Sequence, residues 1–566
     1  MVLTAIKTFY GEKIFYIKNQ YLIVDKIQGE GHQSPKNLFV KKVYTVPFKP
    51  STKSGDEVDK YTVYSDEIPV IISIYRTEDQ FVPVYTVTIP YLEESVLKEI
   101  ASIKDQLINE VKISMEEILD LKKNMVIKKK FFDKAMELLS IKFPTLDEKL
   151  RRMYAYYLLH EMLGLGILEI MLSDDGIEEI VVNNSEEPVW VYHKKHGWLK
   201  TNIKIETEEE IYNYATAIGR RSGREISELK PLMDTHLTTG DRVNSTLCPV
   251  STFGNTITIR KFPRKPFTIT DFVQNQTISS SLLSLIWLSI EYEANIIIAG
   301  GTATGKTSFL NAISAFIPPN QRVISIEDTK ELNLPKFLHW VPMIMREPNP
   351  EGKGEVSMLD LLVNSLRMRP DRIIVGEIRR NREAEVLFEA MHTGHSVLAT
   401  LHAFDSEEAL VRLTNPPIDV PESMVAVLDL FLILGRLRRE RVRKLTEITE
   451  ISPFIGDDGK YHVSINPLFK FHIKTGELLL ENASKKLLDS IRELSGMTYI
   501  ELKNEMYNKK KVIDWIVANN INTTNTVGKI IAEYYRDKDN VLEKISSGAD
   551  PKELLGAFVK ELEVNG

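Results

Sequence analysis

Residues 295–308 read Asn-Ile-Ile-Ile-Ala-Gly-Gly-Thr-Ala-Thr-Gly-Lys-Thr-Ser, and this stretch decides the fold of the region around it. Its first five residues form a short apolar run with a β-branched bias, which is typical of a buried strand. Residues 308–317 have the apolar spacing of a helix, and two prolines end that helix at 318 and 319. Strand, glycine-rich turn and helix in this order are the context of a P-loop, so we predict that the stretch binds a nucleoside triphosphate.

The expected phosphate site has a role for each type of residue in the loop. Glycines at 300 and 305 let backbone N–H groups turn toward a phosphate, and the start of the helix adds the positive end of its dipole. Lys306 is expected on the β- and γ-phosphates of ATP, and Thr307 is expected to ligate Mg²⁺. The residues predicted to bind the nucleotide are Gly300, Gly301, Thr302, Ala303, Thr304, Gly305, Lys306, Thr307 and Ser308.

Composition limits the class of protein. A length of 566 residues predicts two to four domains. The net charge of -7 argues against a generally basic nucleic-acid binder, so no nucleic acid is expected as a partner. A single cysteine, Cys248, excludes an intrachain disulfide and a four-cysteine zinc site. Since no signal peptide and no stretch of about 20 apolar residues is found, we expect a cytoplasmic protein.

Pattern changes along the chain predict several segments. Strands alternate with helical patterns after residue 268, which predicts a parallel, doubly wound α/β sheet with its ligands at the carboxyl ends of the strands. The proline-bounded stretch after residue 262 is the expected linker between domains. The expected segments are a β-rich variable extension at 1–95, a helical segment at 96–172, a smaller α+β domain at 173–262, a linker at 263–270, the P-loop domain at 271–480 and a helical C-terminal region at 481–566.

Two carboxylates follow predicted strands of the P-loop domain. Val323-Ile-Ser-Ile326 precedes Glu327, and Arg372-Ile-Ile-Val375 precedes Gly376 and Glu377. Phosphoryl transfer needs a carboxylate that aligns the attacking water, and cations that balance charge on the γ-phosphate. We predict that Glu327 orients the water and that Glu377 holds Mg²⁺, directly or through the water shell of the ion. For each of them, a strand-end carboxylate that caps a helix is the alternative.

Three histidines lie close together in the sequence at 392, 395 and 402. Their spacing is not the i, i+4 pair of a helical zinc site, and no cysteines accompany them, which argues against a bound metal. We predict that they sense the γ-phosphate or relay hydrogen bonds, with His402 at the catalytic site. A buried histidine whose hydrogen bonds are satisfied is the alternative.

Taken in order, these motifs resemble the secretion ATPase superfamily, the motors of type II secretion, type IV pili and archaella. The resemblance rests on the P-loop at 300–307, Ile326-Glu-Asp-Thr329, Val375-Gly-Glu-Ile-Arg379, and the pair Thr-Gly-His395 and Thr-Leu-His402. It implies a RecA-like P-loop domain with a parallel doubly wound sheet, preceded by a smaller α+β domain. The segments that begin at Arg224, Gly240 and Ile259 are most similar to the archaeal branch.

The resemblance also implies an activity and partners. It implies a homo-hexamer that hydrolyses ATP to ADP and phosphate with Mg²⁺, and in which one subunit offers arginines to the nucleotide of another. By motif match the candidates are Arg224, Arg242 and Arg260, while Lys230 stands where archaellum motors often have arginine. Motion about the linker would pass to a polytopic membrane platform protein, which places this chain at the inner face of the cell membrane through its partner.

Two other functions are compatible with a P-loop. A DNA-transfer or helicase-type ring would share the same core, and it predicts strong, salt-dependent DNA binding. The acidic net charge and the lack of a basic stretch interleaved with aromatic residues argue against it. A non-catalytic regulator would bind nucleotide without turnover; the presence of Lys306, Thr307, Glu327, Glu377 and His402 together argues against that function.

Overall fold

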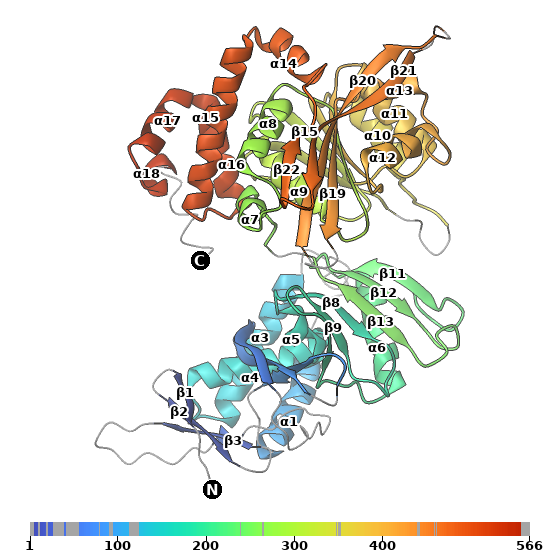
Figure 1. Cartoon of the computed structure of the whole chain (residues 1–566). Helices are drawn as coiled ribbons and strands as arrows, with labels where there is room; N and C mark the ends of the chain where they lie inside the picture. Colours follow the sequence, from blue (N-terminus) through green and yellow to red (C-terminus); the bar gives the residue numbers. More distant parts are fainter. Residues whose placement is uncertain are drawn as a thin grey trace. The chain divides into compact units, whose positions relative to one another are not determined.

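The computed structural model divides the chain into two compact units, Met1–Arg264 and Lys265–Gly566, which are described separately (Figure 1). Before residue 56 it describes four short strands. From 56 to 555 the structure describes the chain apart from residues 78–79, 90–93, 112–123, 238, 263–264, 347, 349–351, 438–441, 458 and 460. Two residues of the expected linker, 263 and 264, therefore lie outside the described residues, as does much of the expected extension before 56.

The first unit is built on a nine-stranded sheet with the order β11-β12-β13-β8-β9-β10-β7-β6-β5. A separate sheet has the order β1-β2-β3-β4. The strands of the small sheet are β1 (Ala5–Phe9), β2 (Glu12–Ile17), β3 (Tyr21–Lys26) and β4 (Phe39–Val40). Those of the large sheet are β5 (Asp56–Ser65), β6 (Ile68–Arg76), β7 (Val84–Thr88), β8 (Ile177–Val182), β9 (Trp190–His193), β10 (Gly197–Thr201), β11 (Leu232–His236), β12 (Arg242–Thr246) and β13 (Thr256–Arg260).

Helices of the first unit bury two separate apolar clusters. One cluster joins the large sheet to the helices that follow residue 164, and the other lies among three longer helices. The helices are α1 (Glu94–Glu110), α3 (Asn124–Lys142), α4 (Glu148–Leu163), α5 (Leu168–Leu172) and α6 (Glu208–Ser222). Thr207 begins α6 by accepting a hydrogen bond from the Glu210 N–H, and Gly223 ends it in the left-handed conformation.

The large sheet crosses the segment boundary expected at residue 95. Strand β7 pairs in parallel with β10, with Lys200 opposite Val84, so β5–β7 extend the sheet that holds β8–β13. Two tyrosines fix this junction, because the hydroxyls of Tyr61 and Tyr85 donate to Asp174 Oδ2 at 2.7 and 2.6 Å. The structure thus differs from the expected separate extension, at least over residues 56–88.

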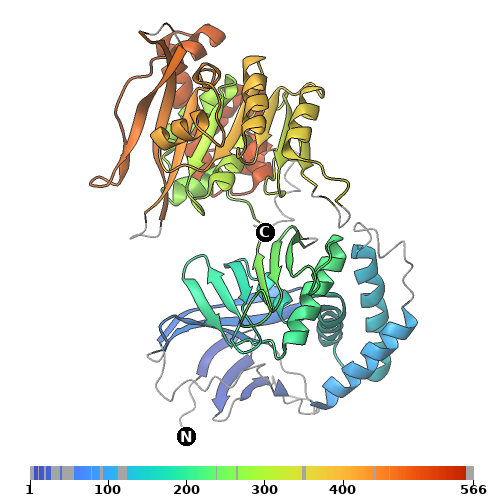
Figure 2. The same ribbon diagram turned by 90° about the vertical axis from the view of Figure 1, so that its right-hand side faces the viewer.

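The second unit contains a nine-stranded sheet with the order β16-β15-β17-β18-β14-β19-β20-β21-β22. The strands from β16 to β19 are all parallel to their neighbours, and β20–β22 add antiparallel strands at one side (Figure 2). The strands are β14 (Ile296–Gly300), β15 (Arg322–Glu327), β16 (His339–Ile344), β17 (Arg372–Val375), β18 (Ser396–Leu401), β19 (Leu430–Leu437), β20 (Val442–Ile455), β21 (Tyr461–His472) and β22 (Glu477–Leu480).

Both faces of the parallel part are covered by helices, as the apolar runs of the sequence predict. Ile296 and Ile298 of β14 face one apolar cluster, and Ile297 and Ala299 face the other, so every residue of the strand is buried. The helices before residue 430 are α7 (Ile269–Gln274), α8 (Ser280–Glu291), α9 (Lys306–Ile313), α10 (Met358–Leu366), α11 (Asn381–His392), α12 (Ser406–Thr414) and α13 (Glu422–Val425), with a short 3-10 helix, η2 (Ser314–Phe316), after α9. The parallel α/β sheet predicted around the P-loop is confirmed.

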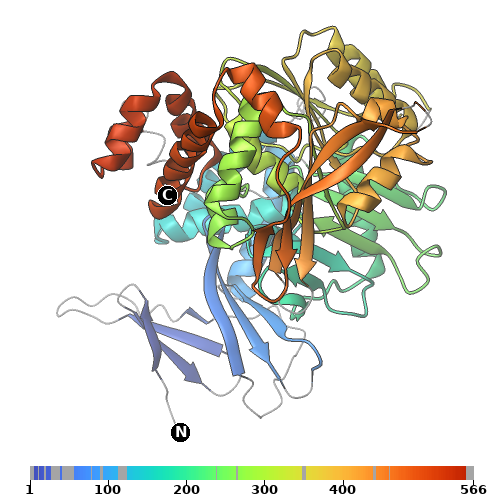
Figure 3. The same ribbon diagram turned by 45° about the horizontal axis from the view of Figure 1, so that its top comes forward.

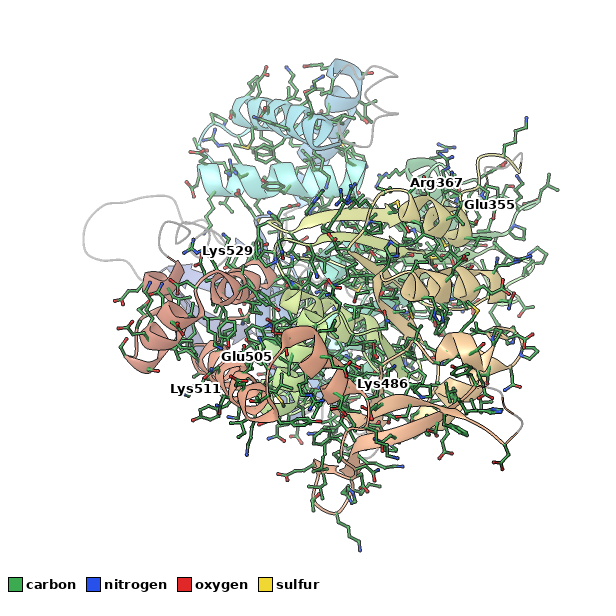
Figure 4. All side chains as sticks on the ribbon, turned by 90° about the horizontal axis from the view of Figure 1, so that it is seen from above. Glu355, Arg367, Lys486, Glu505, Lys511 and Lys529 are labelled. Atoms are coloured by element: carbon green, nitrogen blue, oxygen red, sulfur yellow. The ribbon has the colours of Figure 1, made fainter. Side chains whose placement is uncertain are left out.

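The C-terminal helices pack onto α8 rather than forming a core of their own (Figure 3). They are α14 (Leu487–Ser495), α15 (Tyr499–Ala518), α16 (Thr524–Arg536), α17 (Lys538–Ser546) and α18 (Pro551–Leu555). The fully buried Lys509 of α15 lies between Glu291 of α8, at 2.6 Å, and Glu505, at 3.1 Å. Glu505 is labelled on α15 and Lys529 on α16 in Figure 4. The expected helical region after residue 481 therefore shares the core of the P-loop region.

None of the helices in the described part of the chain is both long and apolar enough to cross a membrane.

Candidate nucleotide site

The glycine-rich loop connects the end of β14 to the start of α9, where sequence analysis placed it. Ala303 and Gly305 both have positive φ angles, 60° and 92°, which turn the loop back on itself before the helix. The Thr304 hydroxyl closes the loop by donating to the Gly301 carbonyl at 2.9 Å. These conformations leave the loop wrapped around the first turn of α9, as phosphate binding requires.

Two glycines of the loop have no room for a side chain. A Cβ at Gly300 would come within 2.5 Å of Thr304 Oγ1 and 2.6 Å of the Leu434 carbonyl oxygen on β19. A Cβ at Gly301 would come within 2.6 Å of the Phe404 ring. The packing of β19 thus requires glycine at position 300, while at position 301 the exposed Phe404 side chain would have to move.

Lys306 and Arg443 hold the backbone of the loop from two sides. The Lys306 ammonium donates to the carbonyls of Gly300 and Gly301 at 3.0 and 3.2 Å. The Arg443 guanidinium, from β20, donates through Nε to the Ala303 carbonyl at 3.1 Å. Arg443 is a basic residue at the loop that sequence analysis did not identify, because the contact spans 140 residues of chain.

Glu327 ends β15 with a buried carboxylate whose two oxygens differ. Oε1 accepts hydrogen bonds from the N–H groups of Glu331 and Leu332, both at 2.9 Å. Oε2 is buried and has no hydrogen-bond partner among the described residues. Burial raises the pKa of Glu327 to about 7, although the two N–H donors act in the opposite direction. A carboxylate with one unoccupied oxygen and a pKa near neutrality is suited to hold a water and accept its proton.

Glu377 follows β17 and is held by an arginine that sequence analysis did not assign. Arg379 Nε donates to Glu377 Oε2 at 2.7 Å, and its Nη1 pairs with Asp328, the neighbour of Glu327. Gly376 lies against Glu327, since a Cβ there would stand 3.5 Å from the Glu327 Cα. The ends of β15 and β17 therefore place both predicted carboxylates near each other, and Arg379 bridges Glu377 and Asp328 beside them.

His402 lies beside the loop, immediately after β18. Its Nε2 is 2.9 Å from the Thr302 hydroxyl, and its ring lies 6.4 Å from that of Phe404 in an edge-on arrangement. Burial and then the positive charge of Lys306 lower the pKa of His402, so the imidazole is neutral near pH 7. A neutral ring can donate or accept a hydrogen bond at a phosphate, which agrees with the predicted relay.

His395 is not at this site, and the prediction of a phosphate sensor is wrong for it. It precedes β18, whereas His402 follows that six-residue strand, so about 20 Å of extended chain separates them. The Nδ1–H of His395 instead donates to the Ala390 carbonyl, 3.1 Å away, and His395 lines a 380 Å³ pocket with Asn295, at the other end of β14 from the loop. His392, the last residue of α11, belongs to the same end of β18.

The predicted arginines lie in the first unit, Arg242 and Arg260 on neighbouring strands and Arg224 in the loop after α6. Arg242 of β12 stands directly opposite Arg260 of β13 on one side and His236 of β11 on the other. Arg242 makes a two-pronged pair with Asp234, at 3.0 and 2.5 Å, and it holds the pKa of that carboxyl below its usual range. Arg224 contributes to the same lowered pKa of Asp234. Arg242 thus stands beside Arg260 in the sheet, and Arg224 acts on the same carboxyl, Asp234, as Arg242 does, while Lys230 pairs with Glu225 at 3.3 Å.

These residues fit a nucleoside triphosphate with Mg²⁺. The loop turns back before the helix through the positive φ angles of Ala303 and Gly305, and Lys306 supplies the positive charge for the phosphates. Thr307, in the first turn of α9, and the carboxylate of Glu377 are oxygen ligands of the kind that Mg²⁺ prefers, directly or through water. Because Arg379 already holds Glu377, contact through the water shell of the ion suits that residue best.

Comparison with known proteins agrees with this geometry. The family described as "Type II/IV secretion system protein" matches residues 165–439. An uncharacterized protein of Methanocaldococcus jannaschii is 36% identical over 396 residues, which cover 68% of this chain and 70% of that protein. The type IV secretion system protein PtlH of Bordetella pertussis is 31% identical over 272 residues, covering 44% of this chain and 79% of PtlH.

The chain belongs to the secretion ATPase superfamily. Among solved structures, the VirB11 ATPase of the Brucella suis type IV secretion system, in complex with sulphate, matches 50% of this chain and 91% of its own length. It has 25% identity and a TM-score of 0.26. The region that matches the superfamily spans the glycine-rich loop, both carboxylates, His402 and the three arginines, and it ends before Arg443.

Proposed function

We propose that this protein is a Mg²⁺-dependent ATPase with a RecA-like P-loop domain, and that it powers the assembly of an archaeal type IV filament, a pilus or an archaellum. The observation that carries the proposal is the meeting of Lys306, Glu327 and His402 at the carboxyl edge of one parallel sheet. Glu327 Oε2 is buried without a hydrogen-bond partner among the described residues, and it supplies the position for an attacking water.

Each side chain has a defined task in hydrolysis. Lys306 would leave the loop carbonyls to neutralise the β- and γ-phosphates, and Thr307 and Glu377 would hold Mg²⁺ and its water shell. Glu327 keeps Oε1 on the two backbone N–H groups and accepts the proton of the water through Oε2. His402 forms a hydrogen bond with the γ-phosphate and is connected to Thr302 of the loop through the 2.9 Å contact. Bound Mg²⁺ supplies charge neutralisation on the phosphate oxygens.

The arginines complete the site from another subunit of a homo-hexameric ring. Arg224, Arg242 and Arg260 are the proposed residues, and the pairing of Arg242 with Arg260 and the action of Arg224 and Arg242 on Asp234 support a shared role. Arg242 would exchange Asp234 for the phosphates, which its exposed position permits. Planar guanidinium groups suit this task because they bind phosphate oxygens in pairs.

Mixing two inactive variants tests the ring. Lys306→Ala removes nucleotide binding but keeps the arginines, and Arg242→Ala with Arg260→Ala keeps the P-loop but removes two arginines. In a ring with identical head-to-tail interfaces, equal random mixing gives about a quarter of the interfaces one intact P-loop and one intact arginine pair. We expect each variant alone to be inactive and the mixture to recover measurable ATP turnover. A mixture as inactive as its parts contradicts the shared site.

The filament role has its own test. A relative in M. jannaschii supports the archaeal assignment, and a platform protein in the membrane is the proposed partner that receives the motion. We expect a deletion strain to lose one class of surface filament and to regain it with the parent gene, but not with the Glu327→Gln gene. A deletion strain that keeps all its surface filaments contradicts this role. Strong, salt-dependent DNA binding by the purified protein would favour the DNA-transfer ring instead.

A further inference from the structure

The segment that follows Glu327 also supplies the donors that hold its carboxylate. Residues 328–338 form this segment, which we call the acidic segment, and its N–H groups at Glu331 and Leu332 bind Glu327 Oε1. Asn333 N–H donates to the Asn311 side chain of α9 at 2.8 Å. The position of the Glu327 carboxylate therefore depends on where this segment lies relative to the helix that begins with Lys306.

Helix α16 of the C-terminal region supports the acidic segment at close range. The Lys336 N–H donates to Asn525 Oδ1, in the first turn of α16, at 2.9 Å. Gly528 lies against Pro335 and Phe337, and a Cβ at position 528 would stand 2.5 Å from Pro335 Cγ and 3.3 Å from the Phe337 ring. Glycine is unfavourable inside a helix, so its presence here serves the close approach of α16 to the segment.

The same helix is fixed to the far end of the P-loop helix. The Tyr535 hydroxyl donates to the Phe316 carbonyl, in η2 directly after α9, and accepts from Trp287 Nε1, both at 2.8 Å. The Trp287 and Phe316 rings stack with centroids 5.1 Å apart. Helix α16 thus connects the two elements whose relative position sets the distance between Lys306 and Glu327.

We infer that α16 is a positioning element for hydrolysis, and that Gly528 and Asn525 place the acidic segment so that Glu327 meets the attacking water. The inference rests on the proposed function of Glu327. A Cβ at 528 demands a shift of the segment away from α16, and a misplacement of about 1 Å is enough to cost on the order of 10²-fold in rate when it moves a catalytic group.

Two substitutions with matched controls test this inference. Gly528→Ala pushes the segment, and Asn525→Ala removes the acceptor for Lys336 N–H. Asn525→Asp keeps an oxygen at that place and suits the first turn of a helix, so it is the conservative control. Arg536→Ala is a second control on the same helix, because Arg536 is exposed and pairs with Glu533.

We expect Gly528→Ala and Asn525→Ala to lower kcat at least tenfold, while the affinity for a fluorescent ATP analogue, measured by equilibrium titration, stays within twofold. We also expect the acidic limb of the pH profile of kcat/KM to move to higher pH, because the Glu331 and Leu332 N–H groups no longer hold the ionised carboxylate. The charged groups facing Glu327 are Lys330 and Glu331 of its own segment and the Asp328–Arg379–Glu377 group beside it. Both controls should behave as the parent protein.

The outcomes separate the inference from the function on which it rests. If Gly528→Ala and Asn525→Ala keep the kcat and the acidic limb of the parent protein while Glu327→Gln is inactive, the role of α16 is overturned and the proposed function is not. Full turnover in Glu327→Gln would overturn the proposed function of Glu327. If Gly528→Ala fails to fold, the contrast between Asn525→Ala and Asn525→Asp decides, and equal activities of that pair would overturn the inference.

Discussion

Replacing Glu327 with glutamine should change how the free energy of unfolding varies with pH, and the size of that change follows from the burial of the Glu327 carboxyl. Burial raises the pKa of this carboxyl from 4.5 to about 7, so the folded state binds its proton more tightly than the unfolded state does. The folded state is therefore favoured below pH 4.5 and loses that advantage as the pH rises through 7. At 1.36 kcal/mol for each pKa unit, ionisation of Glu327 costs the fold roughly 3 kcal/mol at pH 8 and under about 1 kcal/mol at pH 5.

A glutamine side chain does not ionise, so the comparison between the variant and the parent protein isolates the effect of Glu327 ionisation on stability. A glutamine amide at position 327 would leave a polar atom without a partner at the place of Oε2, and that cost does not depend on pH. The difference in unfolding free energy between Glu327→Gln and the parent should thus shift by about 2.5 kcal/mol in favour of the variant between pH 5 and pH 8. In thermal unfolding this is a shift of about 5 °C for a unit of this size. A difference that stays constant from pH 5 to pH 8 would refute the reasoning.

Three further predictions concern contacts around the site and in the core. Gly300→Ala should abolish binding of a fluorescent ATP analogue and lower stability by about 1–3 kcal/mol, because the new Cβ meets Thr304 and a β19 carbonyl; normal affinity in titration would contradict this. Arg379→Ala should lower the Mg²⁺ concentration for half-maximal turnover, since it frees Glu377, and a Mg²⁺ titration with an unchanged midpoint would count against that role. Lys509→Met should destabilise the protein by about 3 kcal/mol, measured by thermal unfolding, because Glu291 loses its buried cation; a loss below about 1 kcal/mol would not fit.

The parallel sheet could be predicted from the sequence because its signals are local. The apolar run before the P-loop is buried on both faces in β14, and the runs before Glu327 and Glu377 became β15 and β17. Parallel strands bring their carboxyl ends to one edge, so the rule that placed the two carboxylates with the loop needed no knowledge of strand order.

The features that sequence analysis misplaced or missed depend on how the strands of the sheets pair. His395 and His402 are close in sequence, but β18 runs between them, and extended chain separates residues far more than a helix does. Arg443 reaches the loop because β19 pairs in parallel with β14 across a long sequence interval and β20 follows β19 as the next strand of the sheet, an arrangement that periodicity cannot reveal. The same holds for β7, whose parallel pairing with β10 brings residues before the expected boundary into the large sheet.

The C-terminal helices show a further limit of the sequence. Their lysines and glutamates suggest a solvated surface, yet Lys509 is fully buried against Trp287, 4.5 Å from its ring. Gly528 and Asn525 gave no signal either, since their partners Pro335, Phe337 and Lys336 lie far earlier in the chain, 189 residues in the case of Asn525 and Lys336. These contacts link the C-terminal helices to the segment that holds Glu327.

The most direct test of the central claim is steady-state ATP hydrolysis by the purified protein with Mg²⁺, beside Lys306→Ala and Glu327→Gln, each checked for binding of an ATP analogue. We predict turnover by the parent, loss of both binding and turnover in Lys306→Ala, and loss of turnover with binding retained in Glu327→Gln. Undiminished turnover in Glu327→Gln would contradict the assignment of the water to this carboxylate, and undiminished turnover in Lys306→Ala would contradict the site itself.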